Sequence, residues 1–570
     1  MRKLAFAVLF ASVSLTACRT PATTGASPAA GAYDMVITNG RIVDGSGNAW
    51  FWGDLAVKGD RIARITPRGL LASAPAARHI DAQGLAVSPG FIDIQAQSYE
   101  NFMMGDGKAI SMVTQGITTA ILGEGDTPAP VNDRILATVS DTAQRRLVAQ
   151  FSGAHGFGQW LEFMQRRGLS ENVGSFLGAG TVRVYAKGEA MGRATVTELD
   201  TMRAMVGRAM QDGAFGVASA LIYPPNSYAS TEELIEASKA SAPYGGVYIS
   251  HMRSEGNQFL EALDEAIRIG REGRVPVEVY HLKASGPRNW AKMPMAIAKI
   301  DSARAAGQDV QANMYLYPAG GNSFAACIPP KYAADGKLLA NLQDAALRPK
   351  IKAELHDENA GYENLCLIGG PENVMVVGFT KPEFKQFEGK RLAEIAQAQG
   401  KDWADVIIDM NIAEKAGLGE ILFLMSEDNI RNQIRQPWMK FGTDAGSEDP
   451  ATATAMTHPR TYGNYPRLLG RYVREQKVTS LEDAVRKSSS AVATRLSLTD
   501  RGVLKEGLKA DILVFDPNTI IDRATFEKPH QLSAGMRYVI VNGVEVIRDG
   551  AHTGAKPGQV VRGPGWTTAK

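Results

Sequence analysis

The 570-residue sequence lacks the motifs that define several common enzyme classes. It has no Gly-x-Ser-x-Gly nucleophile elbow, no P-loop and no Gly-x-Gly-x-x-Gly placed between a strand and a helix. It also has no Cys-x-x-Cys pair and no internal repeat. The net charge is only +2, so the sequence offers no surplus of positive charge for a nucleic-acid partner, and we expect none.

Cysteine is scarce, with three residues in the chain. Cys18 ends the segment Leu15-Thr16-Ala17-Cys18, which follows a basic start and an apolar run, Leu4 to Leu15, that is too short to span a membrane. The segment resembles a bacterial lipobox, whose cysteine is lipidated after cleavage; an ordinary signal peptide with an incidental cysteine is the alternative. We expect an exported, periplasmic protein that meets a membrane only through a lipid at Cys18.

Cys327 and Cys366 are the remaining two cysteines. In an oxidising compartment they are able to pair, but their separation in sequence says nothing about their distance in space. We favour two free buried thiols over a disulfide.

Short β-favouring runs with Asn-Gly and Asp-Gly turns occur at both ends of the chain and are absent from its middle. They cover Tyr33–Gly45 and Asp54–Ile65 near the start, and Ala510–Asp516 and Val539–Ile547 near the end. Two β-rich ends around a different middle predict one discontinuous β-sandwich built from both termini.

The middle of the chain alternates strand-like with helical runs. The helical runs include Glu232–Ala242, Phe259–Glu272 and Ala291–Ala306. The eight strand-like runs are Phe91–Gln97, Thr118–Gly123, Gly174–Gly178, Ala214–Ser219, Gly246–Ser250, Val275–Tyr280, Asp309–Tyr315 and Met439–Thr443. Such alternation predicts a parallel sheet with right-handed crossovers, and eight units predict an α/β fold with a closed (β/α)8 TIM-like barrel.

The gap between the seventh and eighth runs is too long for one crossover. It contains its own strand, Val374–Gly378, and helices near Leu392–Gln399 and Trp403–Ala413, which indicates an inserted subdomain; placed over the catalytic face, it would act as a lid. The predicted organisation is a signal peptide (1–18), a flexible tether (19–32), the sandwich (33–88 and 500–562), the barrel (89–327 and 434–499) and the inserted subdomain (328–433).

Chemically active side chains follow several of these strands. Loops at the carboxyl ends of barrel strands carry the active sites of such folds. The residues at these positions are Gln95 and Gln97 after the first strand, Glu124 after the second, His251 and His281 after the fifth and sixth, and Asp444 after the eighth. Two imidazoles and two carboxylates on one face suit a zinc site with an open coordination position. Spacing alone is a weak signal, because a lone strand-end histidine is more often structural.

Local sequence words strengthen this interpretation. Val87-Ser-Pro-Gly-Phe-Ile-Asp-Ile-Gln-Ala-Gln97 resembles the Pro-Gly-Phe-Ile-Asp-x-His-x-His opening of amidohydrolase-superfamily barrels. Three further motifs support the same resemblance: His251-Met-Arg-Ser-Glu-Gly, Leu221-Ile-Tyr-Pro-Pro and Thr457-His-Pro-Arg-Thr-Tyr-Gly. Together they resemble the N-acyl-D-amino-acid deacylases (D-aminoacylases), from about Tyr33 to Gly550.

The resemblance implies a set of metal ligands. The tightly held zinc of that family binds a cysteine and two histidines, and these positions correspond to Glu124, His251 and His281. Glu124 departs from the family's cysteine, although a carboxylate remains an acceptable zinc ligand. Gln95 and Gln97 occupy the places of the histidine pair that binds a second, weaker metal. An amide is a poor zinc ligand, so we expect one zinc per chain.

The resemblance also assigns residues to substrate. It makes Asp444 the general base toward the attacking water and then the acid toward the leaving nitrogen. It places Arg460 on the substrate's free carboxylate, for which a guanidinium fork is suited. It places a tyrosine and a serine on the substrate; Tyr317 and Ser323 are the best matches, with Tyr315 as a rival.

The sequence therefore predicts a zinc hydrolase that cleaves a linear amide of an N-acyl-D-amino acid or a small acylated peptide carrying a free carboxylate. One alternative is another amidohydrolase activity, on a cyclic amide, an ester or a cell-wall fragment. The other is a non-catalytic barrel that binds a periplasmic ligand, suggested by the loss of the histidine pair. Retention of His251, His281 and Asp444 argues against the second alternative.

Overall fold

Short parallel strands form the centre of the computed structural model, which describes residues 33–567. Each of the eight predicted runs overlaps at least one of them, and nearly all of their residues are buried, as expected when helices cover a parallel sheet. The strands are β6 (Phe91–Asp93), β7 (Ile117–Leu122), β8 (Asn172–Ser175), β9 (Leu177–Gly178), β10 (Gly216–Ala220), β11 (Val247–His251), β12 (Val277–Val279), β13 (Val310–Met314) and β17 (Met439–Phe441).

These strands are hydrogen-bonded as two ladders. Six follow the order β17-β13-β12-β11-β10-β9 and three the order β6-β7-β8. Only Phe176 separates β8 from β9, and a parallel bridge between Ala96 and Ala445 links the ends of β6 and β17. The prediction of a parallel α/β fold is confirmed, whereas the backbone hydrogen bonds do not form one continuous closed barrel.

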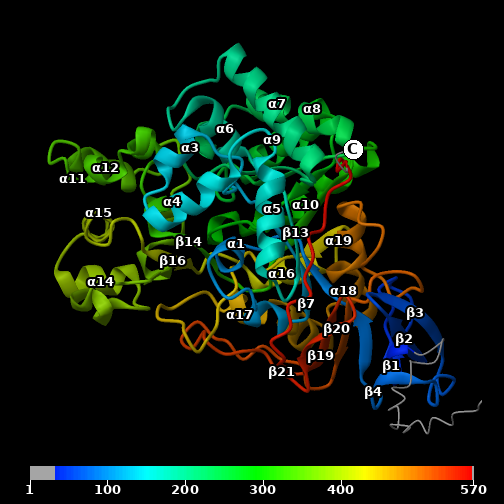
Figure 1. The fold of residues 1–570 in the computed structure, drawn as a ribbon. Coiled ribbons are helices and arrows are strands. Elements are labelled where there is room, and N and C mark those ends of the chain that lie inside the picture. The colour runs from blue at the N-terminus through cyan, green and yellow to red at the C-terminus, as the bar shows by residue number, and fades with distance from the viewer. Residues whose placement is uncertain (1–32, 568–570) are drawn as a thin grey trace, which may run out of the picture.

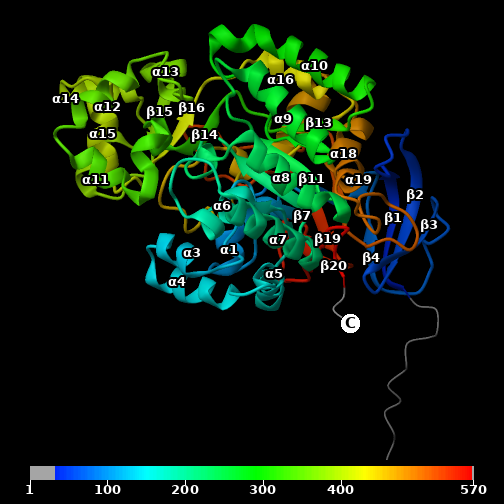
Figure 2. The ribbon, with the colours of Figure 1, turned by 90° about the horizontal axis from the view of Figure 1, so that it is seen from above.

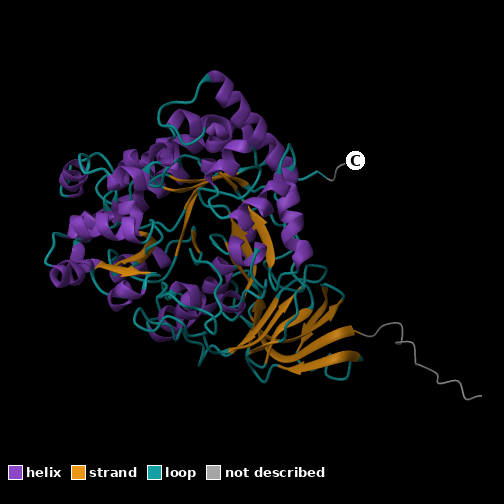
Figure 3. Cartoon of the chain, turned by 60° about the vertical axis from the view of Figure 1, so that its left-hand side comes forward, coloured by secondary structure: helices purple, strands orange, loops and turns teal. Residues whose placement is uncertain are grey.

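Helices surround these strands (Figure 3). The three predicted helical runs are present as α8 (Thr231–Ser241), α9 (Phe259–Gly273) and α10 (Met293–Ala305). α8 starts with a capping box, in which Ser230 and Glu233 satisfy each other's backbone N–H groups, as its sequence favours. The other helices around the strands include α5 (Gly156–Arg167), α6 (Ala179–Lys187), α7 (Val196–Asp212), α16 (Glu427–Ile434), α17 (Arg460–Arg467), α18 (Leu481–Ser488) and α19 (Ser490–Arg495).

Strands from near both ends of the described chain form one nine-stranded sheet, where the first strands (blue) lie beside the last ones (red) in Figure 1. β18 pairs with β5, which continues through Gly90 into β6. A Cβ atom at Gly90 would lie 2.0 Å from Thr118 Oγ1, so the turn requires glycine. The strands are β1 (Tyr33–Ile42), β2 (Phe51–Lys58), β3 (Arg61–Pro67), β4 (Ala76–Asp81), β5 (Ala86–Pro89), β18 (Ile512–Phe515), β19 (Met536–Val541), β20 (Val544–Arg548) and β21 (Ala551–His552).

The segment between β13 and β17 has its own strands, helices and hydrophobic cluster. Figure 2 shows its helices grouped on one side of the molecule. Because most of its buried apolar side chains pack on one another, it forms a largely separate core. Its elements are β14 (Gly320–Ser323), α11 (Leu338–Gln343), α12 (Arg348–Leu355), α13 (Leu365–Gly369), β15 (Val374–Val377), α14 (Leu392–Gln399), α15 (Trp403–Ala413) and β16 (Gly419–Leu422).

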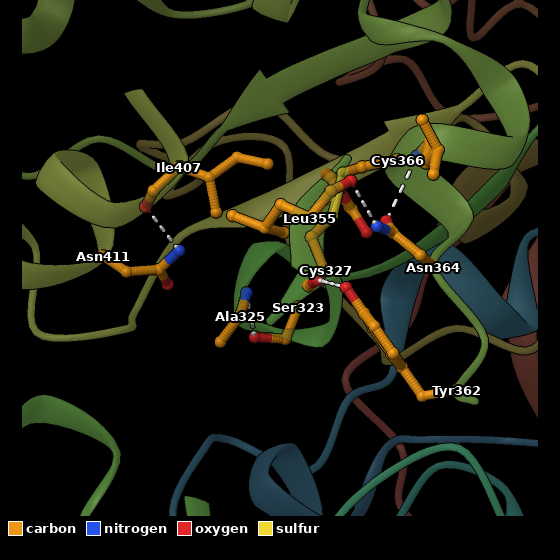
Figure 4. The surroundings of a disulfide bond; sticks show 11 residues. Ser323, Ala325, Cys327, Leu355, Tyr362, Asn364, Cys366, Ile407 and Asn411 are labelled. Carbon is orange, nitrogen blue, oxygen red and sulfur yellow. Dashed lines mark hydrogen bonds between the residues drawn. A yellow bond between two sulfur atoms is a disulfide. The ribbon is translucent and has the colours of Figure 1, made fainter. Parts of the chain in front are cut away.

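Cys327 and Cys366 form a disulfide, which corrects the expectation of two free thiols (Figure 4). The fold brings their Cα atoms to 5.7 Å, although 39 positions separate them in sequence. The carboxyl group of Glu420 lies 3.2 Å from each sulfur, and burial raises its pKa well above the usual value. The Glu420 carboxyl therefore faces the bond, which joins the β14 loop to α13.

Between residues 33 and 567, no helix combines the length and apolar character needed to cross a bilayer. Cys18 and the tether at 19–32 lie outside the described residues.

We expect the disulfide to stabilise the inserted segment. Closing a loop of 39 residues lowers the entropy of the unfolded chain, and the stabilisation is about 3–4 kcal/mol. The Cys327→Ser/Cys366→Ser variant should melt at a lower temperature than the wild type in a non-reducing buffer. A reductant should lower the melting temperature of the wild type and leave that of the variant unchanged; equal melting curves in all four samples would contradict the prediction.

Candidate active site

The predicted ligands follow the carboxyl ends of three parallel strands. Glu124 comes two residues after β7, His251 is the last residue of β11, and His281 lies two residues after β12. His281 has φ +30° and Asp444, beyond β17, has φ +50°. A positive φ costs a non-glycine residue on the order of 1–3 kcal/mol and is concentrated at functional sites. Here it turns two functional side chains out of the strand direction.

Glu124, His251 and His281 converge. Glu124 Oε1 lies 3.2 Å from His281 Nε2 and 3.5 Å from His251 Nδ1. One ligand atom from each of the three residues lies within 4.8 Å of the others. The imidazole rings are nearly perpendicular, with centroids 4.5 Å apart. Three nitrogen and oxygen ligands of this kind fit zinc with an open coordination position.

The second oxygen of Glu124 faces away from the histidines. It accepts hydrogen bonds from Gln95 Nε2 at 2.6 Å and Gln97 Nε2 at 2.8 Å. The two glutamines therefore fix the rotation of the carboxylate and leave Oε1 directed at the histidines. The sequence placed both glutamines at vacated metal positions, but it did not reveal their contact with Glu124.

Behind the histidines lies Glu255, whose role the sequence analysis missed. Glu255 Oε1 lies 3.0 Å from His281 Nδ1, and Oε2 lies 3.7 Å from His251 Nε2. Lys283 Nζ binds both Glu255 oxygens at 2.8 Å and also lies 2.8 Å from His281 Nδ1. A carboxylate behind metal-binding histidines orients their rings. The one sequence feature that pointed to Glu255 was its place in the motif that begins at His251.

The electrostatics of the cluster favour a bound cation. Burial and Lys283 disfavour the charged form of His281, but Glu255, Glu124 and Asp444 outweigh them and raise the pKa of His281 to about 9. Burial lowers the pKa of His251, so its ring stays neutral and able to bind a metal. His251 Nε2 is buried and forms no hydrogen bond. The residues present therefore fit a zinc ion, whose charge would balance the surrounding carboxylates.

The other cluster of potential metal ligands between residues 33 and 567 consists of Cys327, Cys366 and Glu420. Its two sulfurs are bonded to each other, so it offers no thiolate.

Asp444 and Arg460 lie beside the predicted ligands. Arg460 Nη1 is 2.9 Å from Asp444 Oδ2. Burial raises the pKa of Asp444 and the charge of Glu124 adds to the shift, while Arg460 opposes it. A carboxyl with a raised pKa is suited to take a proton and return it later.

Arg460 is held in place at the start of α17. Its backbone N–H donates to His458 Nδ1, and the imidazole is anchored by Nε2 on the carbonyl of Ala319. The guanidinium lies over the ring of Tyr315, 4.5 Å from its centroid, and donates from Nη2 to the carbonyl of Gly321. Nη1 is engaged in the ion pair with Asp444, and Nε has no partner among the described residues. Arg460 lines a cavity of about 300 Å³ together with the predicted ligands.

The position of Tyr317 corrects its predicted role. Its hydroxyl donates to Asp522 Oδ2 at 3.2 Å, and Tyr317 is not among the residues that line the cavity. The rival Tyr315 lines it, so only one of the two tyrosines faces the site. Ser323 also lines the cavity, at the end of β14.

Asp93, the aspartate of the opening motif, connects two strands of the site. It accepts hydrogen bonds from the backbone N–H groups of Gln95 and Thr443, and from the Thr443 hydroxyl. Asp93 therefore ties the strand that carries the glutamines to the strand that carries Asp444. Its role is structural, and burial raises its pKa to about 6.

Comparisons with known proteins agree with this architecture. The amidohydrolase family matches residues 421–547. A D-aminoacylase of Alcaligenes xylosoxydans xylosoxydans is 32% identical over 93% of this chain and 97% of its own length. An N-acyl-D-aspartate deacylase of the same organism is 32% identical over 93% and 95%.

Solved structures give the same result. N-acyl-D-glutamate deacylase from Bordetella bronchiseptica, in complex with zinc and a phosphonate mimic of the tetrahedral intermediate, has a TM-score of 0.75 at 29% identity and covers 93% of this chain and 99% of its own. A D-aminoacylase structure concerned with the role of a binuclear metal centre, with one-metal activation and second-metal attenuation, has the same TM-score and identity over 93% and 100%. This chain therefore belongs to the D-aminoacylase (N-acyl-D-amino-acid deacylase) family of amidohydrolases, enzymes that act on carbon–nitrogen bonds other than peptide bonds.

Proposed function

We propose that this enzyme hydrolyses the amide bond of N-acyl-D-amino acids or small acylated peptides, with one zinc ion per chain. The observation that carries the proposal is one cavity that unites three potential zinc ligands, a carboxyl with a raised pKa and an arginine paired with that carboxyl. The relatives named for acylated D-amino acids support the substrate class.

Glu124, His251 and His281 would hold the zinc. When bound, zinc acts as a Lewis acid on the acyl carbonyl and lowers the pKa of water at its open position. His281 binds through Nε2 and is oriented by Glu255 at Nδ1. Gln95 and Gln97 hold the opposite side of Glu124.

Asp444 performs the proton transfers. It accepts a proton from the attacking water and delivers that proton to the amide nitrogen of the departing amino acid. Arg460 binds the substrate carboxylate through its guanidinium, whose Nε has no partner among the described residues and whose Nη1 also pairs with Asp444. This arrangement places the scissile bond between the zinc ligands and the arginine.

The contacts of Glu124 support the count of one metal. Its second oxygen already accepts two amide donors, and those amides stand where relatives of the family carry ligand histidines. A non-catalytic binding barrel is not supported, because ligands, base and carboxylate-binding arginine share one cavity.

We also propose finer features of the fold. Only one residue separates β8 from β9, so the two count as one barrel strand, and the bridge from Ala96 to Ala445 links the first strand to the last. Both observations support a (β/α)8 barrel of eight strands. The meeting of both termini in one sheet supports the predicted sandwich and the boundaries 33–88 and 500–562. The separate core of the inserted segment supports a subdomain at 328–433, and Leu365 on the cavity wall supports its role as a lid.

Export and lipid anchoring remain our proposal from the lipobox-like segment before Cys18. The Cys18→Ala variant should lose the lipid label and the membrane association of the wild type, and equal membrane association of both proteins would contradict it.

The metal count tests the ligand set. We expect about one zinc per purified chain by elemental analysis, and loss of that zinc in His281→Ala. The double variant Gln95→His/Gln97→His should bind about two metals, since imidazole is a zinc ligand and a neutral amide is not. Two metals in the wild type would contradict the count of one zinc, and one zinc retained in His281→Ala would contradict His281 as a ligand.

The role of Asp444 is tested by Asp444→Asn. The amide cannot accept the proton, so kcat should fall about 10²–10⁴-fold. The zinc content should stay at the wild-type value, which separates lost proton transfer from lost metal. A variant that keeps more than a tenth of the wild-type kcat would rule out Asp444 as the general base.

Arg460→Met tests the substrate class. Removing a charge-assisted contact to the substrate carboxylate should lower kcat/KM for N-acyl-D-amino acids about 10–100-fold. The same substitution should change kcat/KM far less for substrates whose carboxylate is an amide. Because Arg460 favours the ionised form of Asp444, its loss should also move the acidic limb of the pH profile to higher pH.

The matched comparison uses N-acyl-L-amino acids, cyclic amides and esters with the wild type. Higher turnover of any of these than of the D-series would replace the proposed substrate with another amidohydrolase activity on the same site.

A further inference from the structure

A second cavity adjoins the active site and has no part in the chemistry above. It measures about 440 Å³ and shares Gln97, Glu124 and Asp126 with the cavity that holds the zinc ligands. Its other walls come from α1 (Tyr99–Met103), α3 (Asp133–Thr138), α4 (Thr142–Val148) and α6, with part of the β10 loop. We refer to it as the side cavity. A space that opens directly from the zinc ligands is able to hold part of the substrate.

The side cavity lies on the opposite side of the zinc ligands from Arg460. Arg460 contacts Tyr315, Gly321 and Asp444, which follow β13 and β17. The side cavity is lined by Gln97 and Tyr99, which follow β6, and by residues that follow β7, β9 and β10. A substrate with its carboxylate on Arg460 and its carbonyl at the zinc ligands is able to extend its acyl chain toward the side cavity.

The far wall of the side cavity is aliphatic. Ile135, Val148 and Val184 are buried side chains of α3, α4 and α6, and Val139 lies beside them. Burying methylene groups against such side chains is favourable by about 0.8 kcal/mol per methylene. The wall therefore suits a hydrocarbon chain.

Two carboxylates stand on the walls of the side cavity. Asp126 and Glu189 line it, and neither forms an ion pair with any residue of the described chain. Desolvation by the cavity walls and the nearby charge of Glu189 raise the pKa of Asp126 to about 6, although the residue is exposed to solvent, so it is still mostly ionised at neutral pH. Negative charge on the wall disfavours an acyl group that is itself an anion.

We propose that the side cavity is the acyl-binding subsite and that it selects neutral aliphatic acyl groups longer than acetyl. The inference rests on the proposed function, because it assumes that the amide carbonyl is placed at the zinc ligands. It assigns a binding site to the acyl group, the part of the substrate that Arg460 does not contact.

The test compares kcat/KM for N-acetyl-, N-butanoyl-, N-hexanoyl- and N-succinyl-D-leucine. We expect the wild-type values to rise at least about tenfold from acetyl to hexanoyl, since full burial of each of the added methylenes is worth about fourfold. Val139→Trp and Thr138→Trp should each lower the value for hexanoyl at least about tenfold. Both should leave the value for acetyl within about threefold.

Ala137→Trp is the matched control, because Ala137 is an exposed neighbour on α3 that does not line the side cavity. It should leave the whole series unchanged. Thr138 is also exposed, so Thr138→Trp keeps the test valid if Val139→Trp does not fold. A uniform loss across all chain lengths in both cavity variants, or no loss, would overturn the proposal.

Charge selection is tested separately. In both Asp126→Asn and Glu189→Gln, the ratio of N-succinyl to N-butanoyl turnover should be at least about threefold higher than the same ratio in the wild type. An unchanged ratio in both variants would remove the charge-selective part of the proposal.

The two levels of failure are distinguishable. Hydrolysis of acetyl substrates without any dependence on chain length would overturn the acyl subsite and leave the proposed function intact. No hydrolysis of any N-acyl-D-amino acid in a broad panel by the zinc-loaded wild type would overturn the proposed function itself.

Discussion

The active site depends on one carboxylate whose two oxygens contact different partners. Glu124 directs Oε1 to the two histidines and Oε2 to the amides of Gln95 and Gln97. A buried carboxylate without such partners would lose ionisation, since burial alone raises its pKa; the histidines reverse that effect and keep the pKa of Glu124 well below its usual value. The glutamines and the glutamate therefore form one unit, in which three departures from the family pattern explain one another.

The architecture around that unit serves to fix it. Asp93 joins the strand of the glutamines to the strand of Asp444 through three hydrogen bonds. The β5 strand of the terminal sheet runs directly into β6, so both chain ends support the first strand of the site. On the other side, the disulfide between Cys327 and Cys366 connects the β14 loop with α13, next to Ser323 and Leu365 of the cavity wall. A rigid frame of this kind holds a ligand set in place before substrate arrives.

In the proposed function, substrate recognition divides between the two sides of the cluster. Arg460, which would bind the substrate carboxylate, is held by His458, the Tyr315 ring and its ion pair with Asp444. The side cavity offers aliphatic walls and two carboxylates that form no ion pair within residues 33–567. The proposal therefore assigns the two ends of the substrate to different residues of this chain.

Local sequence patterns predicted the strands and the main helices of the inserted segment, because turns and hydrophobic periodicity act over a few residues. The roles of Glu124, His251, His281, Asp444 and Arg460 came from a resemblance carried by short motifs and stay predictions, although the structure brings these residues to one cavity. Only the tertiary structure decided which side chains touch. It turned Tyr315 rather than Tyr317 into the cavity, paired Cys327 with Cys366, and placed Glu255 behind the histidines. Each of these depends on a side-chain direction or on a distance across many residues of chain, and no local pattern fixes either one.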